Sequence, residues 1–139
     1  LLPYPLSPHA SAALAGIEID PEQFILPQTE NRLVVEGAGG LMVPLGRKFL
    51  MLDLMCRLNI PVVLVSRHYL GSINHSLMSI ELLRMRGLTL AGIVFVGEKN
   101  PSTEEVILES AGGVPLVEKV DRVFVQKFAE QFREKNIWA

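Results

Sequence analysis

The sequence has no long hydrophobic run, no dense cluster of lysine and arginine, and one cysteine, Cys56. No apolar stretch reaches the roughly 18 residues that a membrane-spanning helix needs, and a single cysteine excludes a disulfide within the chain. The net charge of -2 offers no positive surface for nucleic acid or an anionic membrane. The N-terminus also lacks a basic region followed by an apolar one. We therefore expect a cytoplasmic protein that binds small molecules.

The 139 residues, 49% of them hydrophobic, are enough for one globular domain with a sizeable core. Short apolar runs rich in β-branched residues predict buried parallel strands, and amphipathic segments between them predict helices. The predicted strands are 32–36, 60–66 and 90–96, with a shorter edge strand within 113–120. The predicted helices are 7–15, 49–59, 72–87, 102–112 and 122–135. This pattern predicts a single α/β domain over residues 1–139, a parallel sheet with helices on both faces.

A glycine-rich loop follows the first predicted strand, in "LVVEGAGGLMVPL". If 32–36 is a buried strand, the carboxylate of Glu36 reaches the crevice where such sheets bind ligands. Gly37, Gly39 and Gly40 would let backbone N–H groups approach an anion closely. Mg²⁺ suits an acid beside an anion, since it is typically held by one or two carboxylates and phosphate oxygens. The alternative is a plain turn, with Glu36 solvated.

A second candidate site follows the next strand, in "VVLVSRHYLGSINHS". Gly71 interrupts the chain, and Ser72 or Asn74 can cap the helix that begins there. Unpaired N–H groups at a helix start attract carboxylate or phosphate. His75 is interpreted as a locally hydrogen-bonded, structural residue, and neither His68 nor His9 has a second ligand at metal-binding spacing.

The two loops together resemble dethiobiotin synthetase, the ATP-dependent enzyme family that closes the ureido ring in biotin synthesis. The resemblance rests on "VEGAGGLMVPL", then "IPVVLVSRHYLGSINH", then "RGLTLAGIVFVGEKNPSTE", with "SPH" near the N-terminus. It implies a P-loop NTPase-like, Rossmann-like three-layer fold and a homodimer. The implied reaction uses ATP, Mg²⁺ and CO₂: a carbamate forms on one amine of 7,8-diaminononanoate, ATP phosphorylates it, and the second amine closes the ring.

The resemblance also assigns roles to individual residues. Glu36 matches the Mg²⁺-binding glutamate, and Gly37 and Gly39 lie in the loop against the phosphates. Val96 stands where the family commonly has an asparagine that reads adenine. The substrate-binding residues that the resemblance implies are Ser7, Gly39, Gly71, Ser72, Ile73 and Asn74.

The sequence departs from the family in two respects. The nucleotide fingerprint GxxxxGK[ST] is absent from the 139 residues, and Val96 cannot make an asparagine's hydrogen bonds. We expect this chain to be the C-terminal portion of a dethiobiotin synthetase, without the P-loop unit and inactive in isolation. The alternative is a non-catalytic relative that retains the dimer interface and an anion-binding crevice. Part of a cobyrinate-type synthase is a third interpretation, which "LGSINH" fits poorly.

Overall fold

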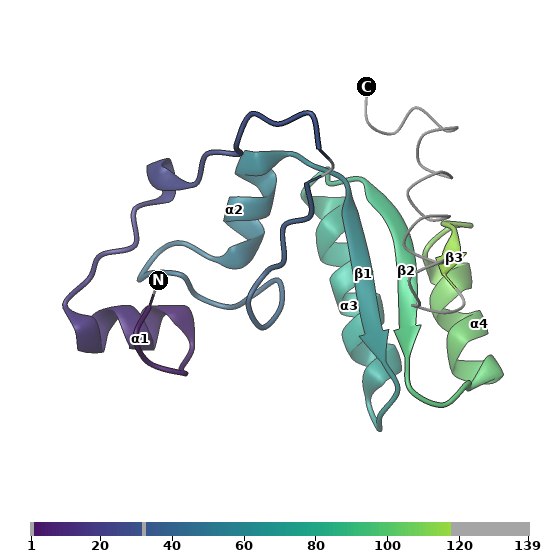
Figure 1. Cartoon of the computed structure of the whole chain (residues 1–139). Helices are drawn as coiled ribbons and strands as arrows, with labels where there is room; N and C mark the ends of the chain where they lie inside the picture. The colour runs from purple at the N-terminus through teal and green to yellow at the C-terminus, as the bar shows by residue number, and fades with distance from the viewer. Residues whose placement is uncertain (1, 32, 118–139) are drawn as a thin grey trace. The chain divides into compact units, whose positions relative to one another are not determined.

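The computed structural model describes residues 2–31 and 33–117, which fall into two compact units, 1–59 and 60–139. The second unit contains the sheet. Its strands are β1 (Val62–Arg67), β2 (Leu90–Val96) and β3 (Leu116–Val117), in the spatial order β1-β2-β3 (Figure 1). Both pairings are parallel, and Leu64 of β1 is in register with Ile93 of β2. The parallel sheet predicted from the sequence is therefore confirmed.

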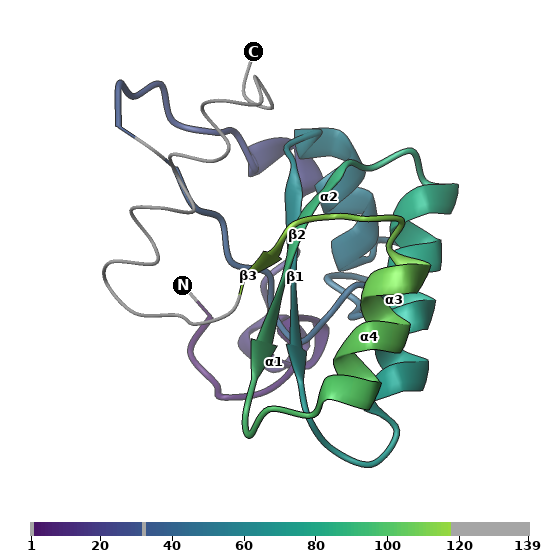
Figure 2. The same ribbon diagram turned by 90° about the vertical axis from the view of Figure 1, so that its right-hand side faces the viewer.

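The helices of the second unit are α3 (Ser72–Met85) and α4 (Pro101–Ser110), and both lie on the same face of the sheet (Figure 2). Their apolar side chains meet β2 in one core. Ile80 of α3, Ile93 of β2 and Ile107 of α4 are buried together. The sequence predicts helices on both faces, but the two helices described in this unit cover one. This packing fixes the carboxyl ends of β1 and β2 relative to the first turn of α3.

The first unit contains α1 (Pro8–Ala15), the short 3-10 helix η1 (Pro21–Gln23) and α2 (Met51–Leu58). α2 begins after Leu50, whose backbone N–H donates to Asp53 Oδ2 at 2.9 Å. A small core forms where Met51 and Leu54 of α2 pack with Leu45. Cys56, on the same helix, is half-buried.

The predicted strand at 32–36 is wrong over its described residues, 33–36, which are irregular in structure. Their side chains are exposed, and Val34 retains 89% of its accessible surface. An apolar, β-branched run forms a strand only when a neighbouring strand accepts its hydrogen bonds and its side chains find a packing surface. The described residues of the first unit contain no named strand with which this segment could pair. Glu36 consequently lies on an exposed loop and not at the end of a strand.

The other predicted elements are close to those observed. α2, α3 and α4 fall within the predicted helices or within one residue of them, and β2 has the predicted bounds. Gly87 has φ +68 just after α3, and its N–H donates to the Arg84 carbonyl at 3.0 Å, so this glycine ends the helix. The helix predicted at 122–135 lies outside the described residues. Within the described residues, no helix is long and apolar enough to cross a bilayer.

Candidate functional site

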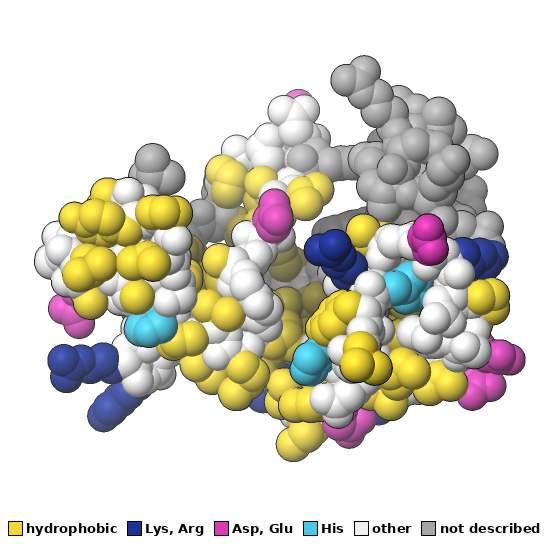
Figure 3. Space-filling view, turned by 90° about the horizontal axis from the view of Figure 1, so that it is seen from below, with side chains coloured by type: hydrophobic (Ala, Val, Ile, Leu, Met, Phe, Trp, Pro, Cys, Tyr) yellow, Lys and Arg dark blue, Asp and Glu magenta, His cyan; other side chains and the backbone are white. Residues whose placement is uncertain are grey.

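The carboxyl ends of β1 and β2 form the edge of the sheet from which the candidate site is built. β1 ends at Arg67 and β2 at Val96, and these two residues are partners in the ladder. The backbone N–H of His68 extends the pairing by donating to the Val96 carbonyl at 3.0 Å. The view from below in Figure 3 shows histidine and hydrophobic side chains exposed near this end of the second unit. Two loops therefore leave the sheet side by side, one toward α3 and one toward α4.

The start of α3 leaves backbone N–H groups without acceptors, but the predicted cap by Ser72 or Asn74 is wrong, since no side chain in the described part of the chain caps this helix. Gly71 is the N-cap, with φ +100, a conformation that side chains of L-residues rarely adopt. The N–H of Ser72 donates to the Tyr69 carbonyl at 3.0 Å, so this amide is already used. Among the described residues, the N–H groups of Ile73 and Asn74 have no acceptor. Two exposed donors at the positive end of a 14-residue helix remain for a ligand.

Side-chain hydrogen bonds hold this helix start on both sides. The hydroxyl groups of Ser66 on β1 and Ser76 on α3 are buried and lie 2.8 Å apart. Tyr69 Oη lies 2.6 Å from His75 Nδ1, and the two rings also contact each other. The local hydrogen bond predicted for His75 is therefore present. Together these bonds fix the first turn of α3 against β1.

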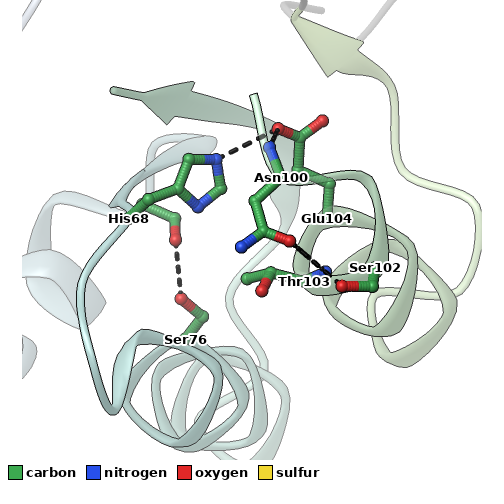
Figure 4. Close-up of polar contacts among 7 residues, drawn as sticks. His68, Ser76, Asn100, Ser102, Thr103 and Glu104 are labelled. Atoms are coloured by element: carbon green, nitrogen blue, oxygen red, sulfur yellow. Dashed lines mark hydrogen bonds and ion pairs between the residues drawn. The ribbon is translucent and has the colours of Figure 1, made fainter. Parts of the chain in front are cut away.

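A third contact joins the β1–α3 loop to α4 (Figure 4). His68 Nε2 lies 3.0 Å from Glu104 Oε1, and the two side chains are 12% and 11% exposed. The same carboxylate oxygen accepts the backbone N–H of Asn100 at 3.0 Å, while Asn100 Oδ1 accepts the Thr103 N–H at 3.2 Å. Glu104 thus completes a reciprocal cap at the start of α4 and binds His68 as well.

The residues assigned to Mg²⁺ and phosphate lie in the first unit. Gly39 and Gly40 have φ of +76 and +119, and a Cβ on Gly39 would lie 2.9 Å from Val43 Cγ2. Gly37 has ordinary φ but little room, since a Cβ there would lie 3.3 Å from Met51 Sδ. The loop geometry therefore requires glycine at position 39.

The carboxylate of Glu36 is exposed and has no partner among the described residues. No group of three or more histidine, cysteine, aspartate or glutamate side chains in the described part of the chain could hold a metal ion. A single free carboxylate nevertheless fits Mg²⁺, which keeps several waters and takes phosphate oxygens as its remaining ligands.

The predicted site residues thus fall in both units. In the second unit, Gly71 to Asn74 lie at the start of α3 and Val96 ends β2, at the edge of the sheet where β1 also ends. In the first unit, Ser7 is the exposed N-cap of α1, and its carbonyl accepts the Ser11 N–H at 2.9 Å.

Sequence reasoning missed the His68–Glu104 contact, because 36 positions separate the two residues. One signal was present. Asn100 directly before Pro101 and a helical segment is the arrangement of a helix N-cap, although Glu104 follows one residue later than the acid of a capping box. That signal predicts the cap but not the histidine.

Comparisons with known proteins agree with the sequence motifs. A family model described as an AAA domain matches residues 1–123. ATP-dependent dethiobiotin synthetase of Christiangramia forsetii is 46% identical over 137 residues, covering 94% of this chain and 65% of the relative. The Nitrobacter hamburgensis protein of the same name is 46% identical, covering 92% and 63%. That of Bradyrhizobium diazoefficiens is 53% identical over 106 residues, covering 76% and 50%.

These relatives confirm the resemblance to dethiobiotin synthetase. The chain spans between 50% and 65% of the length of these curated relatives. The family match covers most of the chain and agrees with the parallel sheet and its flanking helices. The chain belongs to the AAA-domain family and has an α/β fold of the P-loop NTPase-like class.

Proposed function

We propose that this chain contributes the substrate-binding part of a dethiobiotin synthetase, which uses ATP and Mg²⁺ to carboxylate 7,8-diaminononanoate and close its ring. The observation that carries the proposal is the identity of 46% to 53% with relatives named ATP-dependent dethiobiotin synthetase. The exposed helix start at Gly71 supports it, since a substrate with a terminal carboxylate needs an anion site. In this proposal the protein acts in the cytoplasm on small molecules.

The start of α3 binds the substrate carboxylate in this proposal. The N–H groups of Ile73 and Asn74 donate to it, and the helix dipole adds about 0.3–1 kcal/mol at an exposed site. Ser72 donates no hydrogen bond to the carboxylate, since its own N–H is bonded to the Tyr69 carbonyl and its side chain is buried. It holds the first turn of α3 in place beside the two free donors. Gly71 leaves open the space beside the carboxylate, because a Cβ at this position would have His75 Cε1 as its nearest neighbour, at 3.9 Å.

The diamine end of the substrate is assigned to residues of the first unit. The exposed hydroxyl of Ser7 can accept a hydrogen bond from an amine, and the open backbone at Gly39 lets the substrate approach closely. The resemblance assigns the carboxylate and the diamine to different subunits, so we infer that the working form is a homodimer. One amine takes up CO₂ as a carbamate and, once ATP has phosphorylated it, the other amine attacks its carbonyl carbon and phosphate leaves, which requires both amines to be held in one orientation.

Glu36 would hold Mg²⁺, with Gly37 and Gly39 presenting backbone N–H groups to phosphate. When bound, the ion neutralises negative charge on the transferring phosphoryl group. Glu36 itself only has to keep its carboxylate accessible, as its exposed position allows.

The 139 residues do not contain a GxxxxGK[ST] motif, whose lysine holds the β- and γ-phosphates of ATP in P-loop enzymes. Val96 is exposed at the end of β2 and offers only its backbone to a base. ATP dependence is therefore proposed from the relatives, and no step of the phosphoryl transfer is assigned to this chain's side chains.

Titration calorimetry of the 139-residue chain with 7,8-diaminononanoate tests the assignment of the carboxylate site. We expect weak binding, in the millimolar range, that Gly71→Val abolishes, because a β-branched side chain resists φ +100 and crowds the carboxylate. Glu36→Gln is the matched control and leaves the affinity nearly unchanged. Absence of binding by the wild-type chain, or equal binding by Gly71→Val, favours the non-catalytic relative.

A further inference from the structure

We propose that His68 is a positioning residue that acts through Glu104 to hold the start of α3 in its anion-binding geometry. We call the three residues His68, Glu104 and Asn100 the clasp. This inference rests on the proposed function only for what α3 binds. The hydrogen bonds of the clasp all lie within the second unit.

The clasp joins the two loops at the carboxyl edge of the sheet. The backbone N–H of His68 donates to the Val96 carbonyl at the end of β2. Glu104 Oε1 already accepts the backbone N–H of Asn100. A carboxylate oxygen only accepts hydrogen bonds, so His68 donates to the same oxygen from Nε2. His68 therefore contacts both ends of the loop that runs from β2 to α4.

His68 also lies three residues before Gly71, on the segment that leads into α3. Ser76 is held by Ser66 on the helix side of that segment, and Tyr69, within it, is held by His75. Tyr69 also supplies the carbonyl that accepts the Ser72 N–H. If the His68 side chain is released, the segment that carries the Tyr69 carbonyl and Gly71 loses its tie to α4, which is one of the constraints that set the direction of the Ile73 and Asn74 N–H groups.

The orientation of the His68 ring depends on Glu104. Nδ1 is buried and has no partner among the described residues, so the ring has one polar contact. Its other contact is a stack on Phe95, with centroids 5.4 Å apart and planes at 14°. Stacking is equally compatible with a 180° flip of the ring about the Cβ–Cγ bond, whereas the hydrogen bond to Glu104 selects one of the two flipped orientations. Gly97 packs against the other side of the residue, since a Cβ there would lie 3.6 Å from His68 Cβ.

The test compares Glu104→Ala with Glu105→Ala in the 139-residue chain. Glu105 is the adjacent acid on α4, and its side chain is exposed. Amide hydrogen exchange and the affinity for 7,8-diaminononanoate are both measured. We expect Glu104→Ala to speed exchange at Asn100 and Ser72 by roughly tenfold or more, to weaken the affinity by a similar factor, and to leave the amides of β2 protected. Glu105→Ala should change neither quantity.

His68 variants separate positioning from a general loss of stability. His68→Ala should reproduce both effects of Glu104→Ala. His68→Gln should restore much of the protection and the affinity, because its side-chain amide N–H can still donate to Glu104. Equal acceleration of exchange in β2 by His68→Ala would mean that the residue only stabilises the unit, and would overturn the proposal.

Two further outcomes separate the clasp from the proposed function. If Glu104→Ala speeds exchange at Asn100 alone and leaves Ser72 and the affinity unchanged, Glu104 is only the cap of α4 and the proposal fails. If the wild-type chain does not bind the diamine but exchange at Ser72 depends on His68, the clasp stands and the carboxylate assignment is wrong.

Discussion

Replacing Gly71 by alanine should destabilise the second unit measurably, although the added methyl group meets no close neighbour. A Cβ at this position would have only His75 Cε1 within 4 Å, at 3.9 Å, so the whole effect comes from φ +100. A residue with a Cβ held at such a positive φ destabilises the folded state by about 1–2 kcal/mol. Valine should lose more, because its branched side chain narrows the allowed backbone further.

Urea unfolding followed by circular dichroism measures this difference. With a slope of about 1–2 kcal/mol per molar urea for a unit of this size, Gly71→Ala should lower the midpoint by roughly 1 M. Gly46→Ala is the control for glycine loss alone, since Gly46 has no positive φ and a Cβ there would meet no atom within 4 Å. Its midpoint should stay or rise slightly, because alanine restricts the unfolded chain. A midpoint for Gly71→Ala equal to that of the wild type would refute the strain argument.

Core packing, one surface ion pair and the missing phosphate-binding lysine give three other expectations. Ile107→Ala should lower the unfolding free energy by about 2–5 kcal/mol in urea titrations, because Ile107 is fully buried, whereas the exposed Val106→Ala should change it by less than about 0.5 kcal/mol. The hydrogen bond from Arg57 lowers the pKa of Glu22 from its ordinary 4.5. The pair therefore stabilises the first unit at pH above 4.5 and ceases to do so as the pH falls through the lowered pKa. In Arg57→Gln, the pKa of Glu22 measured by NMR titration should return to the ordinary value. The purified chain should form no dethiobiotin from ATP, CO₂ and the diamine, since it lacks the phosphate-binding lysine, and measurable turnover would contradict this.

Self-association is a further expectation. Several large apolar side chains are exposed among the described residues, including Val34, Val65 and Leu70, and extended apolar surface favours association. Light scattering at micromolar concentration should therefore not show a clean monomer. A monodisperse monomer with a cooperative melt would contradict this expectation.

The strands and helices of the second unit could be predicted from the sequence because their side-chain pattern records burial. The run 90–96 is continuously apolar, and β2 is buried over most of its length with the predicted bounds. The spacing of Ile80, Leu83 and their neighbours follows the helical period, and α3 buries these residues. Local chemistry was also sufficient at Gly87, where the end of α3 favours positive φ, but not at the start of α3, where Gly71 is the N-cap in place of Ser72 or Asn74.

The segment 33–36 could not be predicted in this way, because β-branched residues indicate only that a strand is favourable once a partner is present. Leu33, Val34 and Val35 have the composition of a strand, yet all three are exposed. The clasp has a different cause. A hydrogen bond between His68 and Glu104 depends on how the loops after β1 and β2 are brought together, which no local pattern encodes.

Binding of the substrate carboxylate at the start of α3 can be tested by mapping backbone amide shifts during titration with 7,8-diaminononanoate. The matched titration uses the same diamine lacking its carboxylate. We expect the Ile73 and Asn74 amides of the 139-residue chain to shift with the carboxylate compound and not with the carboxyl-free one. Equal shifts with both compounds, or shifts confined to the loop around Glu36, would contradict the assignment of the carboxylate to the start of α3.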